Sequence, residues 1–306
     1  MHEHGLEAGA SLLDTAVDVL LDAALDTLYL IPFLFITYLV MEWIEHRTGE
    51  KSQRAVQRAG AAGPAIGALL GAVPQCGFSA AASTLYAGRV VTLGTLFAVY
   101  LSTSDEMLPI FIAEQVPLTT LFAVLGSKIV IGMVFGFVID AVMRARRLQQ
   151  PHPQIHELCK LDHCHCEEED EGHGVGSIFK SAAVHTLQVT LFVFLISLAL
   201  NVVLEAVGED ALASFIGSNG VLAVVASGIV GLIPNCAASV AIAQLYVDGI
   251  LGTGAMMSGL LSAAGVGLLV LLRSNRPARQ NAYIVIALLA ISVVCGLVFD
   301  ALGIVL

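Results

Sequence analysis

Long apolar runs separated by short polar breaks dominate the pattern of this chain. Each half of the sequence holds four such runs, and most come close to the roughly 20 residues that a helix needs to cross a bilayer. The runs do not alternate with polar residues in the way that membrane strands do. The pattern predicts an all-α polytopic membrane protein with hydrophobic segments at 28–44, 61–87, 91–114, 118–143, 183–206, 220–247, 250–272 and 281–304.

Composition and charge favour the same class. Hydrophobic residues make up 57% and charged residues 13% of the 306 positions, whereas soluble domains have about 45–50% and about 25%. The formal net charge of −11 argues against a nucleic-acid partner. The apolar runs make membrane lipid the expected surrounding. Ahead of the first run, Asp14, Asp18, Asp22 and Asp26 recur every fourth residue, which predicts an acidic amphipathic helix at 1–27 on a membrane surface.

The two halves of the chain align without a gap at an offset of 160 positions. Internal duplication is a usual construction of secondary transporters. It divides the chain into a membrane repeat at 28–143, a polar loop at 144–180 and a second membrane repeat at 181–306. Asp140 pairs with Asp300 near the ends of the repeats, where we expect both carboxylates to be solvated. Other matched pairs are Gly71–Gly231, Pro74–Pro234, Cys76–Cys236, Ser79–Ser239, Tyr86–Tyr246 and Ser102–Ser262.

Basic residues gather in the polar breaks at 45–58, 144–180 and 273–279, and the positive-inside rule places these breaks in the cytoplasm. Three hydrophobic segments lie between successive cytoplasmic breaks, and three single crossings cannot return the chain to its starting side. We therefore predict that 61–87 and 220–247 are re-entrant hairpins, each made of two half-helices that are broken at a proline. The repeats are then inverted relative to each other, with about ten membrane segments and with both termini outside.

Each predicted hairpin carries a Pro-x-Cys element, in "VPQCGFSAAASTLY" and "IPNCAASVAIAQLY". Broken helices at the membrane midplane form substrate sites in transporters with inverted repeats. The start of a helix favours a thiolate, and two thiolates suit a soft metal or metalloid ion. The alternative is that the cysteines pack as small apolar side chains, as we expect for the unmatched Cys295. The candidate substrate-binding residues are Pro74, Gln75, Cys76, Ser79, Pro234, Asn235, Cys236 and Ser239.

Three charged residues inside predicted spans are candidates for ion coupling, because charge within a membrane is costly. Asp105 and Glu106 lie within the segment 91–114 and have no acidic counterparts in the second half. Lys128 lies in the next span, at a depth from which it could pair with either acid. Either Lys128 and one acid form an ion pair that orders the helices, or one acid carries a proton or binds a cation during transport.

The loop at 144–180 concentrates imidazole, thiol and carboxylate groups. Histidine and cysteine together suit zinc, copper or cadmium. Cys164, His165 and Cys166 are too closely spaced for one tetrahedral structural site. We predict a cytoplasmic metal-collecting tract, and the alternative is a solvated linker. The candidate metal ligands are His152, His156, Cys159, His163, Cys164, His165, Cys166 and His173.

With these motifs the chain resembles a ten-span family of heavy-metal exporters, whose bacterial members are labelled arsenic efflux protein or manganese transporter. The resemblance rests on the repeated Pro-x-Cys elements and covers the chain apart from the acidic N-terminus and the His/Cys loop. The organoarsenical permeases, which also carry cysteine beside proline in a membrane segment, are more distantly similar. The resemblance implies efflux of a soft metal or metalloid through Cys76 and Cys236, although Asp105, Glu106 and the amides could serve a harder ion.

These features predict a secondary transporter that exports a heavy-metal or metalloid ion across the bacterial inner membrane with proton coupling. No P-loop, Ser-His-Asp or metalloprotease motif is present in the sequence. We therefore expect no enzyme activity and no required cofactor, with the transported or loop-bound metal ion as the partner. Two alternatives stay open: a permease for a small anion or organic solute with Lys128 as its counter-charge, and a metal-sensing membrane protein. The sequence also leaves a homodimer open.

Overall fold

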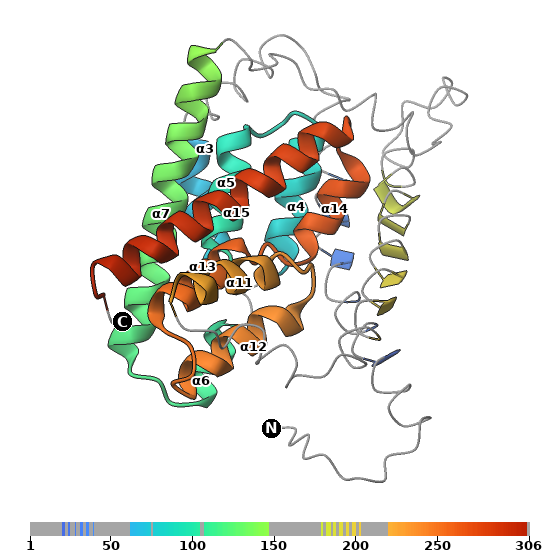
Figure 1. The fold of residues 1–306 in the computed structure, drawn as a ribbon. Coiled ribbons are helices and arrows are strands. Elements are labelled where there is room, and N and C mark those ends of the chain that lie inside the picture. The colour runs from blue at the N-terminus through green and yellow to red at the C-terminus, as the bar shows by residue number, and fades with distance from the viewer. Residues whose placement is uncertain are drawn as a thin grey trace, which may run out of the picture.

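The computed structural model describes residues 62–74, 76–104, 107–146 and 220–304, together with isolated helical positions between 20 and 39 and between 179 and 202. The predicted acidic helix and the predicted metal-binding loop lie outside this part of the chain except for a few positions at their ends. All regular structure in the four continuous ranges is helical (Figure 1). The helices are α3 (Gly63–Gly71), α4 (Cys76–Ala87), α5 (Leu93–Ser102), α6 (Met107–Ala113), α7 (Leu118–Ala145), α11 (Val221–Gly231), α12 (Cys236–Val247), α13 (Thr253–Ser262), α14 (Val266–Ser274) and α15 (Ala278–Ala301).

The same order of helices occurs on both sides of the polar loop. Cys76 begins α4 and Cys236 begins α12, while Pro117 and Pro277 directly precede the long helices α7 and α15. The packing also recurs, because α5 contacts α3, α4 and α7 as α13 contacts α11, α12 and α15. The alignment at an offset of 160 therefore relates helices that have the same neighbours within each half.

Two further contacts join the halves to each other. Helix α4 packs against α14, and helix α12 packs against α6 (Figure 1). Each helix that begins with a cysteine thus lies beside the last short helix of the other half. Helices α5 and α13 also contact each other, and both are buried along their length. The centre of the molecule is therefore built jointly by the two halves.

Three helical stretches of the described ranges are long and apolar enough to cross a bilayer: Leu118–Ala145, Thr253–Ser274 and Ala278–Ala301. Most residues of α7 and α15 are not buried, and α7 exposes large apolar side chains such as Phe122, Val130 and Val138. Its buried residues recur at intervals of three or four positions and so form one stripe. A helix that buries only a stripe while its other faces stay apolar is typical of contact with lipid.

Breaks occur inside four of the predicted hydrophobic segments, and only two of these were expected. The expected breaks fall at 72–75 and 232–235, where a proline removes a backbone donor. The segments predicted at 91–114 and 250–272 are also interrupted, because α5 ends before α6 begins and α13 ends before α14 begins. The stretch Thr253–Ser274 taken as a whole is still long and apolar enough to cross a bilayer, as predicted. Side-chain hydrogen bonds and backbone geometry accompany the second pair of breaks, and Pro109 in the first turn of α6 favours a helix start there.

The break after α5 follows a run of hydroxyl residues. Thr103 has an extended ψ of 126°, and its hydroxyl donates to the carbonyl of Val99 at 2.8 Å. The hydroxyl of Ser104 donates to the carbonyl of Ser102 at 2.9 Å, so side chains replace helical bonds at this point. In the second half, Gly265 has a φ of 54°, a conformation that glycine adopts without steric cost.

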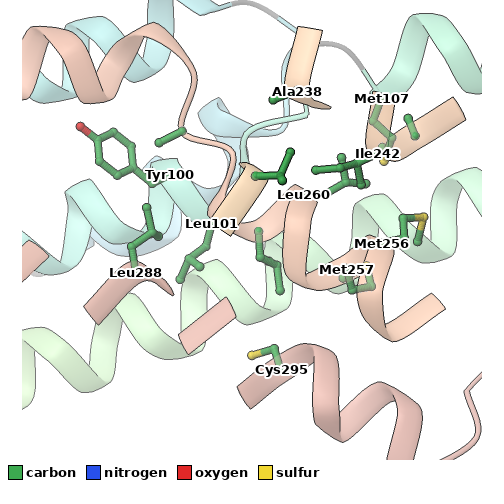
Figure 2. Packing of buried hydrophobic residues seen from close by; sticks show 14 of the residues in the cluster. Tyr100, Leu101, Met107, Ala238, Ile242, Met256, Met257, Leu260, Leu288 and Cys295 are labelled. Carbon is green, nitrogen blue, oxygen red and sulfur yellow. The ribbon is translucent and has the colours of Figure 1, made fainter. Parts of the chain in front are cut away.

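The hydrophobic core lies around α5 and α13. Figure 2 shows Leu260, Met256 and Met257 of α13 near Met107 and Ile242, which come from α6 and α12. Cys295 of α15 is 8% exposed and belongs to the same cluster. Its predicted role as a small apolar packing residue is confirmed.

Candidate substrate and coupling site

The two Pro-x-Cys elements lie at equivalent turns between short helices. Pro74 and Pro234 precede the first residues of α4 and α12 by two positions. The Asn235 side chain is buried, and its backbone N–H donates to the carbonyl of Ile233 at 2.7 Å. Gln75 and the side chains of Cys76 and Cys236 lie outside the described part of the chain. Their role as substrate ligands stays a prediction, while the backbone places each cysteine at a helix start.

In helical register, position 76 shares a face of α4 with Ser79 and Ser83. Both serines are fully buried, and this face lies against α14. The approach is close, since a Cβ built on Gly267 would lie 2.7 Å from the Cβ of Ser79. The face of α4 that carries Ser79 and Ser83 therefore packs on the other half.

The packing of α12 differs in detail. Ala238 and Ile242, which Figure 2 shows near Met107 at the start of α6, are buried but lie on another face than position 236. The residues equivalent to Ser79 and Ser83 are Ser239 and the buried Ala243. Ser239 is only half-buried. The two cysteine-bearing helices thus contact the start of a short helix of the opposite half, but the hydroxyl that was predicted as a ligand is fully buried only in the first half.

A hydrogen-bonded cluster beside Ser79 was not predicted from the sequence. The hydroxyls of Ser83 and Tyr100 lie 2.6 Å apart, and both reach the carbonyl of Gly267, at 2.7 and 3.1 Å. The cluster links α4 and α5 to the first turn of α14. Its residues have no polar counterparts in the second half, where Ala243 and Leu260 occupy the equivalent positions. Only this loss of repeat symmetry in polar residues could have indicated the cluster.

Lys128 is 1% exposed and lies at the same crossing. Its ammonium donates to the carbonyl of Thr103, directly after α5, and to the carbonyl of Leu260 in α13 at 2.9 Å. Asp105 and Glu106 lie outside the described residues, so their pairing with Lys128 and their coupling role stay predictions. Lys128 is nevertheless the point where the ends of two central helices meet.

The expected solvation of Asp140 is wrong. Asp140 is fully buried, and its carboxylate accepts hydrogen bonds from the Gly94 N–H at 2.9 Å and from the Thr92 hydroxyl at 2.7 Å. These donors lie at the start of α5, where backbone N–H groups lack helical partners and favour a negative charge. Asp300 is exposed, as expected, but accepts the equivalent bond from the Gly254 N–H at 3.0 Å.

A polar clamp joins the α4–α5 turn to the start of α15. Gln280 donates to the Tyr86 hydroxyl at 2.6 Å and accepts from the Arg89 guanidinium at 3.1 Å. The guanidinium lies over the Tyr86 ring, 5.2 Å from its centroid. Arg89 has a φ of 58°, which is strained for a residue with a Cβ, and the equivalent residue of the second half is Gly249 with a φ of 73°. The side-chain contacts of Arg89 offset this strain.

No group of three or more His, Cys, Asp and Glu side chains that could hold a metal ion occurs among the described residues. The ligands that we predicted for the cytoplasmic tract all lie outside these ranges, so the tract stays a prediction. They are His152, His156, Cys159, His163, Cys164, His165, Cys166 and His173.

Comparison with known families gives a match over more than half of the chain. A family described as "Putative, 10TM heavy-metal exporter" matches residues 12–185, which is more than half of the chain. The chain belongs to this family. The heavy-metal exporter family consists of ten-span membrane proteins, and together with the apolar helices this identifies a multi-pass membrane protein of a transporter class. Comparison with curated proteins and with solved structures gave no match.

The range that matches the heavy-metal exporter family differs from the range that we expected. It includes most of the N-terminal segment and the His/Cys loop, which the sequence resemblance had left out. It ends at residue 185, so the second membrane half is connected to the family through its alignment with the first half at an offset of 160.

Proposed function

We propose that this protein is a secondary transporter that exports a heavy-metal or metalloid ion across the bacterial inner membrane. The observation that carries the proposal is the pair of Pro-x-Cys helix starts, one in each half, whose helices both pack against the opposite half. Membership in the heavy-metal exporter family gives the class of cargo. A site shared by two related halves is what alternating access requires, because each half can move relative to the other around it.

Cys76 and Cys236 are the proposed soft ligands of the cargo. Each is the first residue of a helix, where the unpaired N–H groups and the helix dipole favour a thiolate. Gln75 and Asn235 add amide groups beside them, and Ser79 adds a hydroxyl one turn further along α4. Thiolate ligands select soft ions such as trivalent arsenic or cadmium over manganese, so the proposed cargo is a soft metal or metalloid.

The proposed topology is an inverted repeat with two re-entrant hairpins. Helices α3 and α4 have 9 and 12 residues, and α11 and α12 have 11 and 12 residues. A helix of this length spans at most about 18 Å, whereas the hydrocarbon core is about 30 Å thick. Each short helix therefore ends inside the membrane. With the basic breaks in the cytoplasm, this arrangement gives ten segments and places both termini outside.

Energy for export is proposed to come from proton entry, with Asp105 or Glu106 as the proton carrier. The cytoplasmic tract at 152–173 is proposed to raise the local concentration of the ion before it enters the site. The alternative permease for an anion would need Lys128 as a counter-charge. The Lys128 ammonium instead donates to two backbone carbonyls, so the contacts favour metal export over that alternative.

The proposal is tested by metal accumulation in cells that carry Cys76→Ser, Cys236→Ser or both. Arsenite, cadmium, zinc and manganese are compared, and Cys295→Ser is the matched control because Cys295 is buried in α15 and packs in the core. We expect each site variant to lose export of the soft ions at least tenfold, and Cys295→Ser to export normally. Normal export of every ion by the double variant would show that the cargo site is elsewhere.

Deletion of residues 152–173 tests the tract separately. We expect the deletion to weaken export when the metal is scarce and to leave the maximal rate unchanged, because the tract gathers ions and does not translocate them. Membrane-impermeant labelling of single cysteines tests the topology. Labelling of residues 45–58 from outside the cell would contradict the proposed orientation.

A further inference from the structure

Two central helices end inside the buried core, and their carbonyl ends meet. Helix α5 ends at Ser102 and helix α13 ends at Ser262, and both are buried along their length. The last turn of any helix leaves carbonyl groups without helical donors and carries a partial negative charge. In α13, the N–H of Ala264 donates to the carbonyl of Ser262 and so leaves the Leu260 carbonyl to other donors.

The Lys128 ammonium is held by both of these ends. It donates to the carbonyl of Thr103, which follows α5, and to the Leu260 carbonyl at 2.9 Å. An ammonium has three N–H donors and no acceptor, so it suits a site made of carbonyl oxygens. The partners lie 25 and 132 positions away in the sequence, so one charge joins the two halves of the transporter.

The equivalent position of the second half holds no charge. Leu288 replaces Lys128, and Tyr100 replaces Leu260, at the offset of 160. Figure 2 shows Leu288 near Tyr100 and Leu101, and α15 contacts α5 as this equivalence requires. If both halves needed the same structural contact at this position, residues 128 and 288 would both be polar or both be apolar. The single lysine indicates one cation position at the centre of the molecule.

We propose that the carbonyl oxygens at the ends of α5 and α13 form a site for a small monovalent cation, filled by the Lys128 ammonium as a tethered occupant. In transporters with broken helices, carbonyls at helix ends and in unwound backbone coordinate the coupling cation. Here the Lys128 side chain occupies that position. It follows, if the proposed export function holds, that transport needs neither sodium nor potassium.

The test removes the Lys128 ammonium by substitution and adds a free alkylammonium ion to the solution. Lys128→Ala deletes the atoms from Cγ to Nζ, which n-propylammonium reproduces in number and charge. The Tm of the purified full chain is measured in choline chloride, with added n-propylammonium, sodium or potassium. Neutral 1-propanol controls for filling of the cavity alone. Leu288→Ala is the matched control, because it opens a cavity at the equivalent buried position without removing a charge.

We expect Lys128→Ala to have a lower Tm than wild type in choline chloride, and n-propylammonium to restore more than half of the loss in a saturable manner. Propanol should restore little, and wild type and Leu288→Ala should not respond to any cation. Lys128→Met, which fills the space without charge, should be destabilised and should not respond. If Lys128→Ala aggregates in choline, recovery during purification with n-propylammonium supports the site.

Three results would overturn the proposal: a Tm of Lys128→Ala equal to that of wild type, a loss that no cation reverses, or aggregation with and without n-propylammonium. These stability results do not depend on export. Failure of the cation site can therefore be distinguished from failure of the proposed export function. A second arm measures metal export, which in Lys128→Ala should require n-propylammonium and in wild type should be the same in choline, sodium and potassium. Sodium- or potassium-dependent export by wild type would refute the tethered cation.

Discussion

Asp140 and Asp300 make the same hydrogen bond in the two halves of the protein. Each carboxylate accepts from the N–H of a glycine 46 positions earlier, Gly94 at 2.9 Å and Gly254 at 3.0 Å. In both halves this bond joins the end of a long helix to the start of a central helix. The two environments differ, because Asp140 is fully buried and Asp300 is exposed.

This difference predicts unequal costs for the same substitution. Asp140→Ala leaves the buried Gly94 N–H without its acceptor and removes one partner of the half-buried Thr92 hydroxyl, so we expect the free energy of unfolding to fall by about 2–3 kcal/mol. Asp300→Ala should cost less than about 1 kcal/mol, because Asp300 is exposed and solvent already weakens its part-buried bond to the Gly254 N–H. Denaturation of the two purified variants in detergent measures the difference. Equal losses would mean that burial does not set the strength of this bond.

Close contact between α5 and α7 depends on glycine. A Cβ on Gly136 would lie 2.7 Å from the Gly94 carbonyl oxygen, whereas a Cβ on Gly126 of the same helix would meet nothing within 4 Å. We expect Gly136→Ala to force the helices apart and to lose about 1–3 kcal/mol of stability. Gly126→Ala should be neutral or should stabilise α7 by up to about 1 kcal/mol. The Tm values of the two variants test this, and a Gly136→Ala protein as stable as wild type would contradict the packing.

The cluster of Ser83, Tyr100 and Gly267 predicts energetic coupling across the halves. Ser83→Ala and Tyr100→Phe each leave one donor on the Gly267 carbonyl, so each alone should cost roughly 0.5–1 kcal/mol. The double variant leaves that buried carbonyl with neither hydroxyl and should cost more than the sum of the single variants. A double-mutant cycle on the stability of the purified protein measures the coupling. If the stability losses of the two single variants simply add in the double variant, the two hydroxyls act independently.

The clamp around Gln280 predicts a local change in dynamics. Gln280→Ala removes the bonds to Tyr86 and Arg89, and it should raise the hydrogen exchange rate of the backbone amides at 88–91 by at least threefold, because local opening costs less. Thr120→Ala alters the equivalent position of the first half and should leave exchange at 88–91 unchanged. Hydrogen exchange with mass spectrometry measures both. Unchanged exchange in Gln280→Ala would show that the clamp does not restrain this turn.

Features that recur locally along the chain were predictable. Apolar runs predict membrane helices because a helix that crosses a bilayer needs predominantly apolar residues. The alignment at an offset of 160 predicts that the two halves have the same order of helices. It also places Cys76 and Cys236 at equivalent positions of the two halves. Proline predicted the breaks at 72–75 and 232–235, since a missing backbone donor acts within one helical turn.

The sequence alone thus determined the membrane class, the duplicated order of helices and the proline breaks. Only the tertiary structure decided that α5 ends inside the core, that Asp140 is buried and that Lys128 reaches the Leu260 carbonyl of the other half. These features depend on which helix lies beside which. A polar residue in an apolar run has the same local pattern whether its partner is water, a carboxylate or a backbone carbonyl 132 positions away, and packing alone supplies that partner.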